Sequence, residues 1–298
     1  MTILVTGATG NVGSLVLSGL RQRGLPARAA VRDPGRAGHA GDAVAFDFVD
    51  SSTWAPAFAG SDAIFLMRPP AITNIKRDIA PALEAAKTAG VRHVVFMSLQ
   101  GADRIPVVPH ARVETWLRDS GMSWTFLRPS FFMQNLSTTH APAIRDLSEI
   151  VVPAGGGRTA FVDVVDVAAV AVEALCDPER HRDRVWTPTG TSADTYEEVA
   201  RVLSTELGRP IRYTRPGLWR YARHARRTLA MPWGLVAVTA AIYTTARIGL
   251  AAGLTPDVQT VTGRPPGTLA AFAHRERAVW VARSGVEKWS RQEPEADK

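Results

Sequence analysis

The first 130 residues alternate short apolar runs with stretches in which apolar residues recur at helical spacing. The apolar runs predict β-strands over residues 2–6, 27–31, 43–46, 63–67, 91–98 and 123–127. The stretches between them predict helices over residues 11–23, 52–59, 72–89 and 109–119. Strands that alternate with helices at this spacing form βαβ units with parallel strands and helices on both sheet faces. The sequence therefore predicts an α/β fold with a doubly wound parallel sheet of the Rossmann type.

After residue 135 the alternation stops. A glycine-rich loop at 155–157 precedes a predicted strand at 159–162, a helix at 166–176, a strand at 184–188 and a helix at 195–207. Asp166 is expected to cap the first of these helices, and the spacing of Asp194 and Glu197 resembles a capping box at the second. Beyond Pro210, one strand is followed by mainly helical sequence. We expect residues 1–135, with 159–190 adding to the sheet, to form one domain and residues 136–298 a smaller, mainly helical region.

The turn after the first strand is rich in glycine and opens the first helix. Gly7 permits a tight turn, Gly10 lets the backbone approach a pyrophosphate, and Gly13 lets helix and strand pack closely. The free amides and the positive end of the helix can then hold phosphate groups. A glycine triplet alone is also compatible with a simple turn, but its place at the head of βαβ units predicts dinucleotide binding. The remaining loop residues expected at the cofactor are Thr9, Asn11 and Val12.

The residues after the second strand predict which dinucleotide binds. NAD-binding proteins usually place an acidic residue at this strand end, where it accepts from the ribose 2′-hydroxyl. Here Arg32 comes first and Asp33 only after it, followed by Pro34. The planar guanidinium of Arg32 suits a 2′-phosphate. We therefore expect NADP(H), with the alternative that Asp33 binds the ribose and Arg32 points to solvent.

Several stretches resemble one family in the same order along nearly the whole chain. They include Thr6–Gly13, Val31–Pro34, Phe46–Phe48, Val95–Ser98, Ser120–Pro129, Thr159–Ala168 and Thr262–Pro266. Together they resemble the NmrA-like group of atypical short-chain dehydrogenases/reductases, which includes NADPH:quinone oxidoreductase-like enzymes and NADP-sensing regulators. The resemblance implies further cofactor contacts from Asp47, Phe48, Met67, Arg68, Ser98 and Pro129.

The resemblance also locates a reaction centre that lacks two expected residues. Ser98 stands where the wider superfamily carries its catalytic serine, but the tyrosine and the lysine four residues later are missing. His110 and Glu114 occupy those positions. His110 is either a proton donor or a structural residue that holds the loop 101–109. Glu114 either orients His110 or is solvated on the helix surface. The Ser98 hydroxyl either binds a substrate carbonyl or forms its hydrogen bond with the backbone.

A quinone or activated enone needs little help from an acid, because its reduced oxyanion is delocalised. Phe131 and Phe132, after the sixth strand, could pack against such a flat substrate, with one of them in the core instead, and Asn135 is a further substrate candidate. We expect an NADPH-dependent oxidoreductase that reduces a quinone or a related aromatic or polyketide-type carbonyl, with residues 136–298 binding the substrate. The alternative is a non-catalytic NADP(H)-binding redox sensor.

Composition limits the partners and the compartment. One cysteine, Cys176, excludes an internal disulfide and suits the cytoplasm. The net charge is +7, but the basic residues are scattered and are mostly arginine, so we expect no nucleic-acid partner. The apolar stretch 230–246 is too short to cross a bilayer and predicts a buried or substrate-lining helix. The arginines at 220, 223, 226 and 227 form a solvated stripe, a subunit contact or an anion site. We expect a small-molecule substrate, no metal and no membrane partner, and leave a homo-oligomer open.

Overall fold

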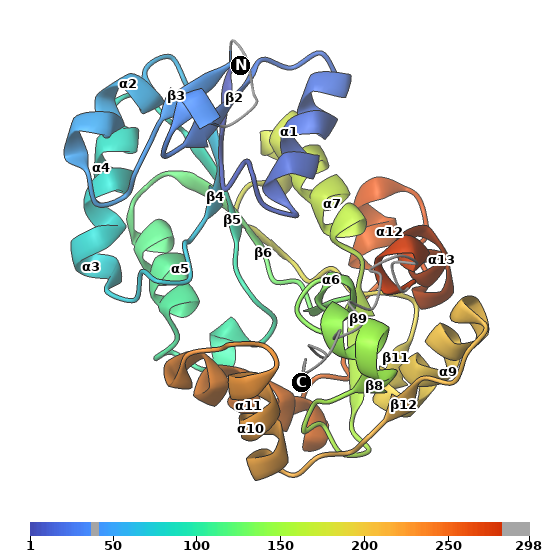
Figure 1. The fold of residues 1–298 in the computed structure, drawn as a ribbon. Coiled ribbons are helices and arrows are strands. Elements are labelled where there is room, and N and C mark those ends of the chain that lie inside the picture. Colours follow the sequence, from blue (N-terminus) through green and yellow to red (C-terminus); the bar gives the residue numbers. More distant parts are fainter. Residues whose placement is uncertain (37–41, 282–298) are drawn as a thin grey trace, which may run out of the picture.

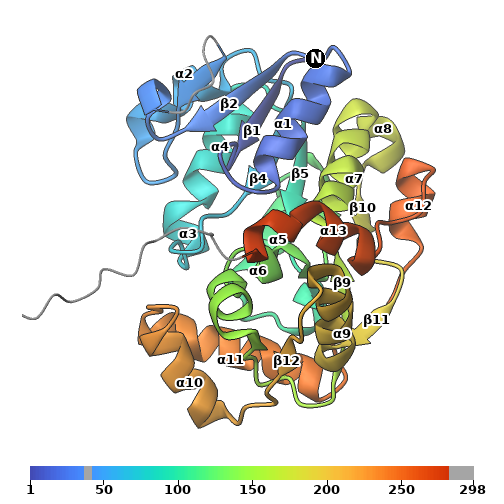
Figure 2. The same ribbon diagram turned by 45° about the vertical axis from the view of Figure 1, so that its right-hand side comes forward.

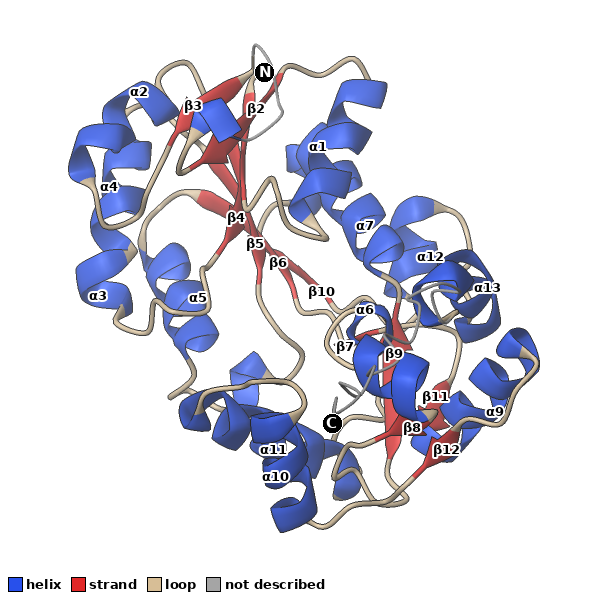
Figure 3. Ribbon diagram, in the orientation of Figure 1, coloured by secondary structure: helices blue, strands red, loops and turns tan. Residues whose placement is uncertain are grey.

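The computed structural model describes residues 1–36 and 42–281. Its centre is a seven-stranded sheet with the order β10-β6-β5-β4-β1-β2-β3, and every neighbouring pair is parallel. The predicted doubly wound parallel sheet is therefore confirmed (Figure 3). The strands are β1 (Ile3–Thr6), β2 (Ala27–Val31), β3 (Ala43–Ala45), β4 (Ala63–Met67), β5 (His93–Met97), β6 (Ser123–Leu127) and β10 (Arg184–Trp186).

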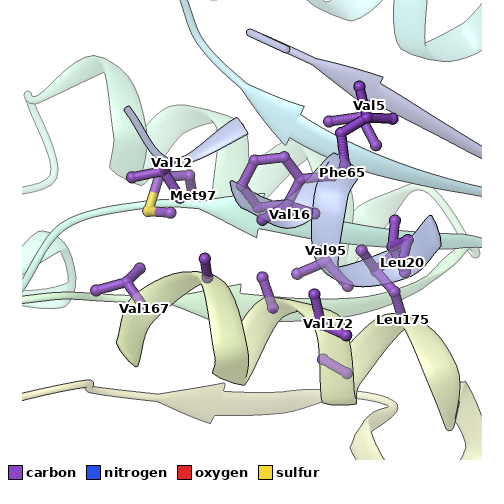
Figure 4. Packing of buried hydrophobic residues seen from close by; sticks show 14 of the residues in the cluster. Val5, Val12, Val16, Leu20, Phe65, Val95, Met97, Val167, Val172 and Leu175 are labelled. Atoms are coloured by element: carbon purple, nitrogen blue, oxygen red, sulfur yellow. The ribbon is translucent and has the colours of Figure 1, made fainter. Parts of the chain in front are cut away.

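Helices cover both faces of this sheet (Figure 1). Successive residues of a strand point to opposite faces of the sheet, so they pack in two separate hydrophobic cores. Val5 lies in one core and Leu4 in the other. One core lies under α1 (Gly13–Gln22), α7 (Val164–Cys176) and α12 (Asp257–Thr262), and Figure 4 shows valines and leucines of α1 and α7 meeting Phe65 and Val95. The other lies under α2 (Trp54–Phe58), α3 (Ile75–Asp78), α4 (Ala80–Thr88) and α5 (Pro109–Asp119).

The rest of the chain forms a second lobe beyond the carboxyl ends of the strands (Figure 1). A three-stranded sheet with the order β11-β9-β7 and a β12-β8 pair lie within it. Its strands are β7 (Phe131–Phe132), β8 (Glu149–Ile150), β9 (Arg158–Val162), β11 (Ala193–Thr195) and β12 (Arg212–Tyr213). Its helices are α6 (Gln134–Ser137), α9 (Tyr196–Leu207), α10 (Leu218–Arg227), α11 (Trp233–Arg247) and α13 (Leu269–Trp280). The short α8 (Pro178–His181) follows α7.

Three local predictions need correction. The predicted helix 72–89 is two helices, because Asn74 caps α3 and Pro81 stands in the first turn of α4, where its missing N–H costs nothing. Helix α7 begins at Val164, so its cap is Asp163 rather than Asp166. At α9 the capping box is formed by Thr195 and Glu198, one residue later than the pair we expected, because α9 begins only at Tyr196, directly after the last residue of β11.

Candidate functional site

The glycine turn after β1 has the tight geometry that its sequence predicts. Gly7 has a φ of +63°, and its carbonyl accepts the N–H of Gly10 at 2.9 Å. A Cβ placed on Gly13 would lie 2.2 Å from the Gly7 carbonyl oxygen, so no side chain fits there. The Thr6 hydroxyl donates to the Phe65 carbonyl at 3.0 Å and accepts from the Met67 N–H at 2.7 Å, which ties the turn to β4.

This turn leads into a helix end that is open to an anion. No side chain of the described residues caps the N-terminus of α1, so its first amides and the positive end of the helix dipole remain directed at whatever occupies the turn. Thr9 and Asn11 are exposed on it, whereas Val12 is buried and anchors α1. The turn lies where the order of the sheet reverses, between β1 and β4, and ligands of open α/β sheets bind outside such points. A pyrophosphate therefore fits this cradle.

The other expected cofactor residues follow the ends of β2, β3 and β4. Arg32 is exposed directly after β2, while a carboxylate oxygen of Asp33 accepts the N–H of Gly35 at 3.0 Å. Asp47 is half-buried and accepts the N–H of Val49.

The remaining members of that set have structural contacts as well. Phe48 is buried against Phe46, with ring centres 4.7 Å apart, and the Met67 side chain packs under Gly7. The guanidinium of Arg68 donates to the carbonyls of Pro69, Pro70 and Ile72, so it holds its own loop.

Ser98 and Glu114 belong to a buried ionic cluster that sequence reasoning missed. The Ser98 hydroxyl donates to one carboxylate oxygen of Glu114 at 2.6 Å. Arg128, just after β6, donates to both oxygens of that carboxylate at 2.9 and 2.6 Å, and Arg118 adds a contact at 3.3 Å. Glu114 is only 1% exposed, so it is not a solvated helix residue. The hydroxyl hydrogen of Ser98 is committed to Glu114 rather than to the backbone.

His110 lies in the first turn of α5, with its ring stacked on Phe96 at 6.1 Å between ring centres. Burial lowers the pKa of His110 to about 4, the nearby positive charge of Arg68 acts in the same direction, and Glu114 opposes it. Near neutral pH the imidazole is therefore uncharged. It can offer an N–H to a bound acceptor, but it does not hold the proton of an imidazolium.

This pKa predicts a pH dependence of stability. In the unfolded chain His110 takes up a proton near pH 6.5, but in the folded protein only near pH 4. The contribution of the neutral imidazole to the free energy of unfolding is thus fully present above pH 6.5 and is lost as the pH falls toward 4. Between pH 7 and 5, the loss of unfolding free energy in a His110→Gln variant should be smaller than in the wild type by about 2 kcal/mol.

Urea unfolding at the two pH values measures this difference. Equal pH dependence in the His110 variant and the wild type would show that the buried imidazole does not titrate as described.

The expected substrate residues lie beyond β6. Phe131 packs against the core of the second lobe, and Phe132 packs against the core beneath α1 and α7. The two neighbouring rings therefore contact different lobes. Both are half-buried, as is Asn135. The backbone carbonyl of Asn135 accepts the N–H of His140 at 2.9 Å. Of the two rings, Phe131 is the one that faces the aromatic cluster of the second lobe, with its ring 6.4 Å from that of Tyr243.

All four tyrosines of the chain lie in one cluster, in which Tyr196 and Tyr221 contact Tyr243 and Tyr213 contacts Tyr196. The Tyr243 hydroxyl is 2.6 Å from the buried Nε2 of His140, and burial raises the tyrosine pKa and lowers that of His140 to about 4. No sequence signal could reveal this cluster, since its members come from segments up to 103 residues apart. It supplies neutral hydrogen-bonding groups beside Phe131.

Two buried aspartates near the start of α7 form hydrogen bonds and ion pairs with residues of α6, α13 and the segment between α12 and α13. Asp163 accepts from Gln134 at 2.8 Å and from Arg275 at 2.7 Å, while Asp166 accepts the N–H of Gly267 at 2.7 Å and pairs with Arg264 at 3.0 Å. Within residues 1–36 and 42–281, no group of three acidic, histidine or cysteine side chains could hold a metal ion.

Comparisons with known proteins agree with this architecture. The chain is 37% identical over 291 residues to the NAD(P)H azoreductase of Xenophilus azovorans, which covers 94% of this chain and 99% of that one. It is 37% identical over 276 residues to the (4-alkanoyl-5-oxo-2,5-dihydrofuran-3-yl)methyl phosphate reductase of Streptomyces griseus, with 88% and 93% covered.

A solved structure and a family model complete the comparison. The NADPH-dependent quinone oxidoreductase of Escherichia coli, complexed with NADPH, superposes with a TM-score of 0.82 at 26% identity, covering 92% of this chain and 99% of that one. The model of the NmrA-like family matches residues 1–218. The chain belongs to the NmrA-like family.

Proposed function

We propose that this protein is an NADPH-dependent oxidoreductase that reduces a quinone or a related flat, aromatic acceptor. The observation that carries the proposal is the glycine cradle at the uncapped end of α1, which admits a pyrophosphate and no side chain. The names of its relatives, an azoreductase and a quinone oxidoreductase, support an acceptor with a delocalised electron system. When bound, the reduced nicotinamide supplies a hydride to that acceptor.

The residues around the expected reaction centre favour an acceptor that needs no strong acid. Ser98 donates its hydroxyl hydrogen to Glu114, and His110 is neutral, so neither offers an acidic proton near neutral pH. The ionic cluster of Ser98, Glu114 and Arg128 instead fixes the ends of β5 and β6 and the face of α5. The protein therefore accelerates the reaction by positioning and orienting the acceptor against the nicotinamide, which suffices for a quinone.

The reaction can be tested by following NADPH oxidation at 340 nm with a panel of quinones, azo compounds and simple ketones. We expect turnover with quinones or azo compounds and little with simple ketones. Tight NADPH binding without turnover across the panel would instead support the non-catalytic redox sensor.

Coenzyme choice is tested at Arg32. A charge-assisted contact with the 2′-phosphate is worth about 1.5–3 kcal/mol, which corresponds to a preference of about 10- to 150-fold for NADPH over NADH. Arg32→Ala should remove this preference and leave NADH affinity unchanged, as measured by fluorescence titration. Arg92, an exposed arginine before β5, serves as the control. Equal binding of NADH and NADPH by the wild type would favour Asp33 as the ribose contact.

A further inference from the structure

Positive charge is concentrated in one segment of the second lobe. Residues 207–256 contain eight arginines and no aspartate or glutamate, whereas the whole chain has a net charge of +7. The remainder of the chain is therefore slightly acidic, although it holds 27 of the 35 lysines and arginines, so the segment differs from it mainly in its lack of acidic residues. The eight are Arg209, Arg212, Arg215, Arg220, Arg223, Arg226, Arg227 and Arg247.

Helix α10 turns four of these arginines outward. Tyr221 and Ala225 are buried on its inner face, and the outer face carries Arg220, Arg223, Arg226 and Arg227. Arg220 lies 4.0 Å from Glu149 of β8. The other three have no acidic partner in the described part of the chain. Trp219, which is 79% exposed, stands among them.

Helix α11 is apolar on its outer face as well as its inner one. Val236, Tyr243 and Ala246 are buried, yet Val238 is 56% and Trp233 61% exposed. Leu235 and Ile242 are also exposed. A helix that is apolar all round is normally buried. The sequence-based expectation of a buried or substrate-lining helix 230–246 therefore leaves one face of α11 uncovered in the described structure.

The two helices form one hairpin. The Arg226 guanidinium lies 5.3 Å from the centre of the Trp233 ring, and the Tyr221 hydroxyl donates to Thr239 at 2.6 Å. Figures 1 and 2 show the hairpin at the opposite end of the molecule from α2 and β2. We call its exposed side chains the hairpin surface, which consists of Leu218, Trp219, Arg220, Arg223, Arg226, Arg227, Trp233, Leu235, Val238 and Ile242.

We infer that the hairpin surface attaches the protein to an anionic lipid bilayer. Helices that lie in a bilayer interface combine exposed tryptophans and aliphatic residues with arginines, and lipid phosphates supply the negative charge that this segment lacks. A second copy of the chain would bring the same arginines face to face, and a nucleic acid would leave α11 uncovered. No described helix is long and apolar enough to cross a membrane. This inference revises our expectation of no membrane partner and holds whichever acceptor is reduced.

Co-sedimentation with vesicles tests the inference. The wild type should pellet with vesicles of phosphatidylcholine and phosphatidylglycerol at least 10-fold better than with phosphatidylcholine alone, and less at high salt. Val238→Glu with Ile242→Glu should abolish binding. Arg223→Glu with Arg227→Glu should lower it more than 10-fold. NADPH affinity should stay unchanged in both variants, which shows that they are folded.

A matched control changes exposed apolar residues elsewhere. Val49→Glu with Leu147→Glu makes the same chemical change outside the hairpin and should leave vesicle binding intact. The inference is overturned if the wild type stays in solution with anionic vesicles, or if the control variant loses binding as fully as the hairpin variants. A dimer that dissociates in the Val238→Glu, Ile242→Glu variant, with no vesicle binding by the wild type, would assign the surface to a second copy instead.

Discussion

Replacing Glu114 with alanine should destabilise the protein by about 3–5 kcal/mol, the usual cost of leaving one partner of a buried ion pair uncompensated. Arg128 would keep its charge inside the protein, with Asp103 at 3.3 Å as the remaining carboxylate near it. Ser98 would also lose the acceptor of its hydroxyl. Urea unfolding followed by circular dichroism measures the change.

Two further variants separate the buried charge from other effects. Arg118→Ala removes the half-exposed partner of Glu114 and should cost less than about 1 kcal/mol. Replacing Glu114 and Arg128 together by leucine removes both charges and should be much less harmful than Glu114→Ala alone. A loss below 1 kcal/mol for Glu114→Ala would show that the cluster does not stabilise the fold.

Gly13→Ala should lower NADPH affinity by about 100-fold or more. The new Cβ would lie 2.2 Å from the backbone oxygen of Gly7, so α1 and the turn must separate. This displaces at least two amides from the phosphates, and each charge-assisted hydrogen bond is worth about 1.5–3 kcal/mol. Fluorescence titration with NADPH gives the affinity directly.

Gly234→Ala is the matched control for this change. Gly234 lies on the exposed side of α11, and no non-neighbouring atom of residues 1–36 and 42–281 lies within 4 Å of the position of a Cβ, so alanine fits there and favours the helix. Its NADPH affinity should equal that of the wild type. Normal affinity in Gly13→Ala would place the coenzyme somewhere other than this turn.

The features that could be predicted from the sequence are local ones. The parallel strands follow from apolar runs of four to eight residues, and the predicted ends of β2, β4 and β6 coincide with the observed ones. The glycine turn was recognisable because the tight turn and the close helix–strand approach each demand glycine at fixed spacing. Gly24, Gly60, Gly90 and Gly121 each follow a helix with a positive φ, a position that favours glycine.

The features that escaped prediction depend on distant partners. Glu114 occupies a helix position that a solvated glutamate could also occupy, and only the fold brings Arg128 to it. The contact between His140 and Tyr243 likewise depends on how the second lobe closes. Asp166 lies three residues after the true cap, and its role became clear only from Gly267 and Arg264, about 100 residues later. Sequence spacing carries no information on such pairs.

The most direct test of the proposed reaction is a single-turnover measurement. Protein loaded with one equivalent of NADPH is mixed with 1,4-benzoquinone without oxygen, and the absorbance of bound NADPH at 340 nm is followed. We predict full loss of this absorbance with formation of one equivalent of hydroquinone, and a slower reaction when the transferred hydrogen of NADPH is deuterium. Bound NADPH whose absorbance decays no faster with the protein than without it would contradict the assignment as a reductase.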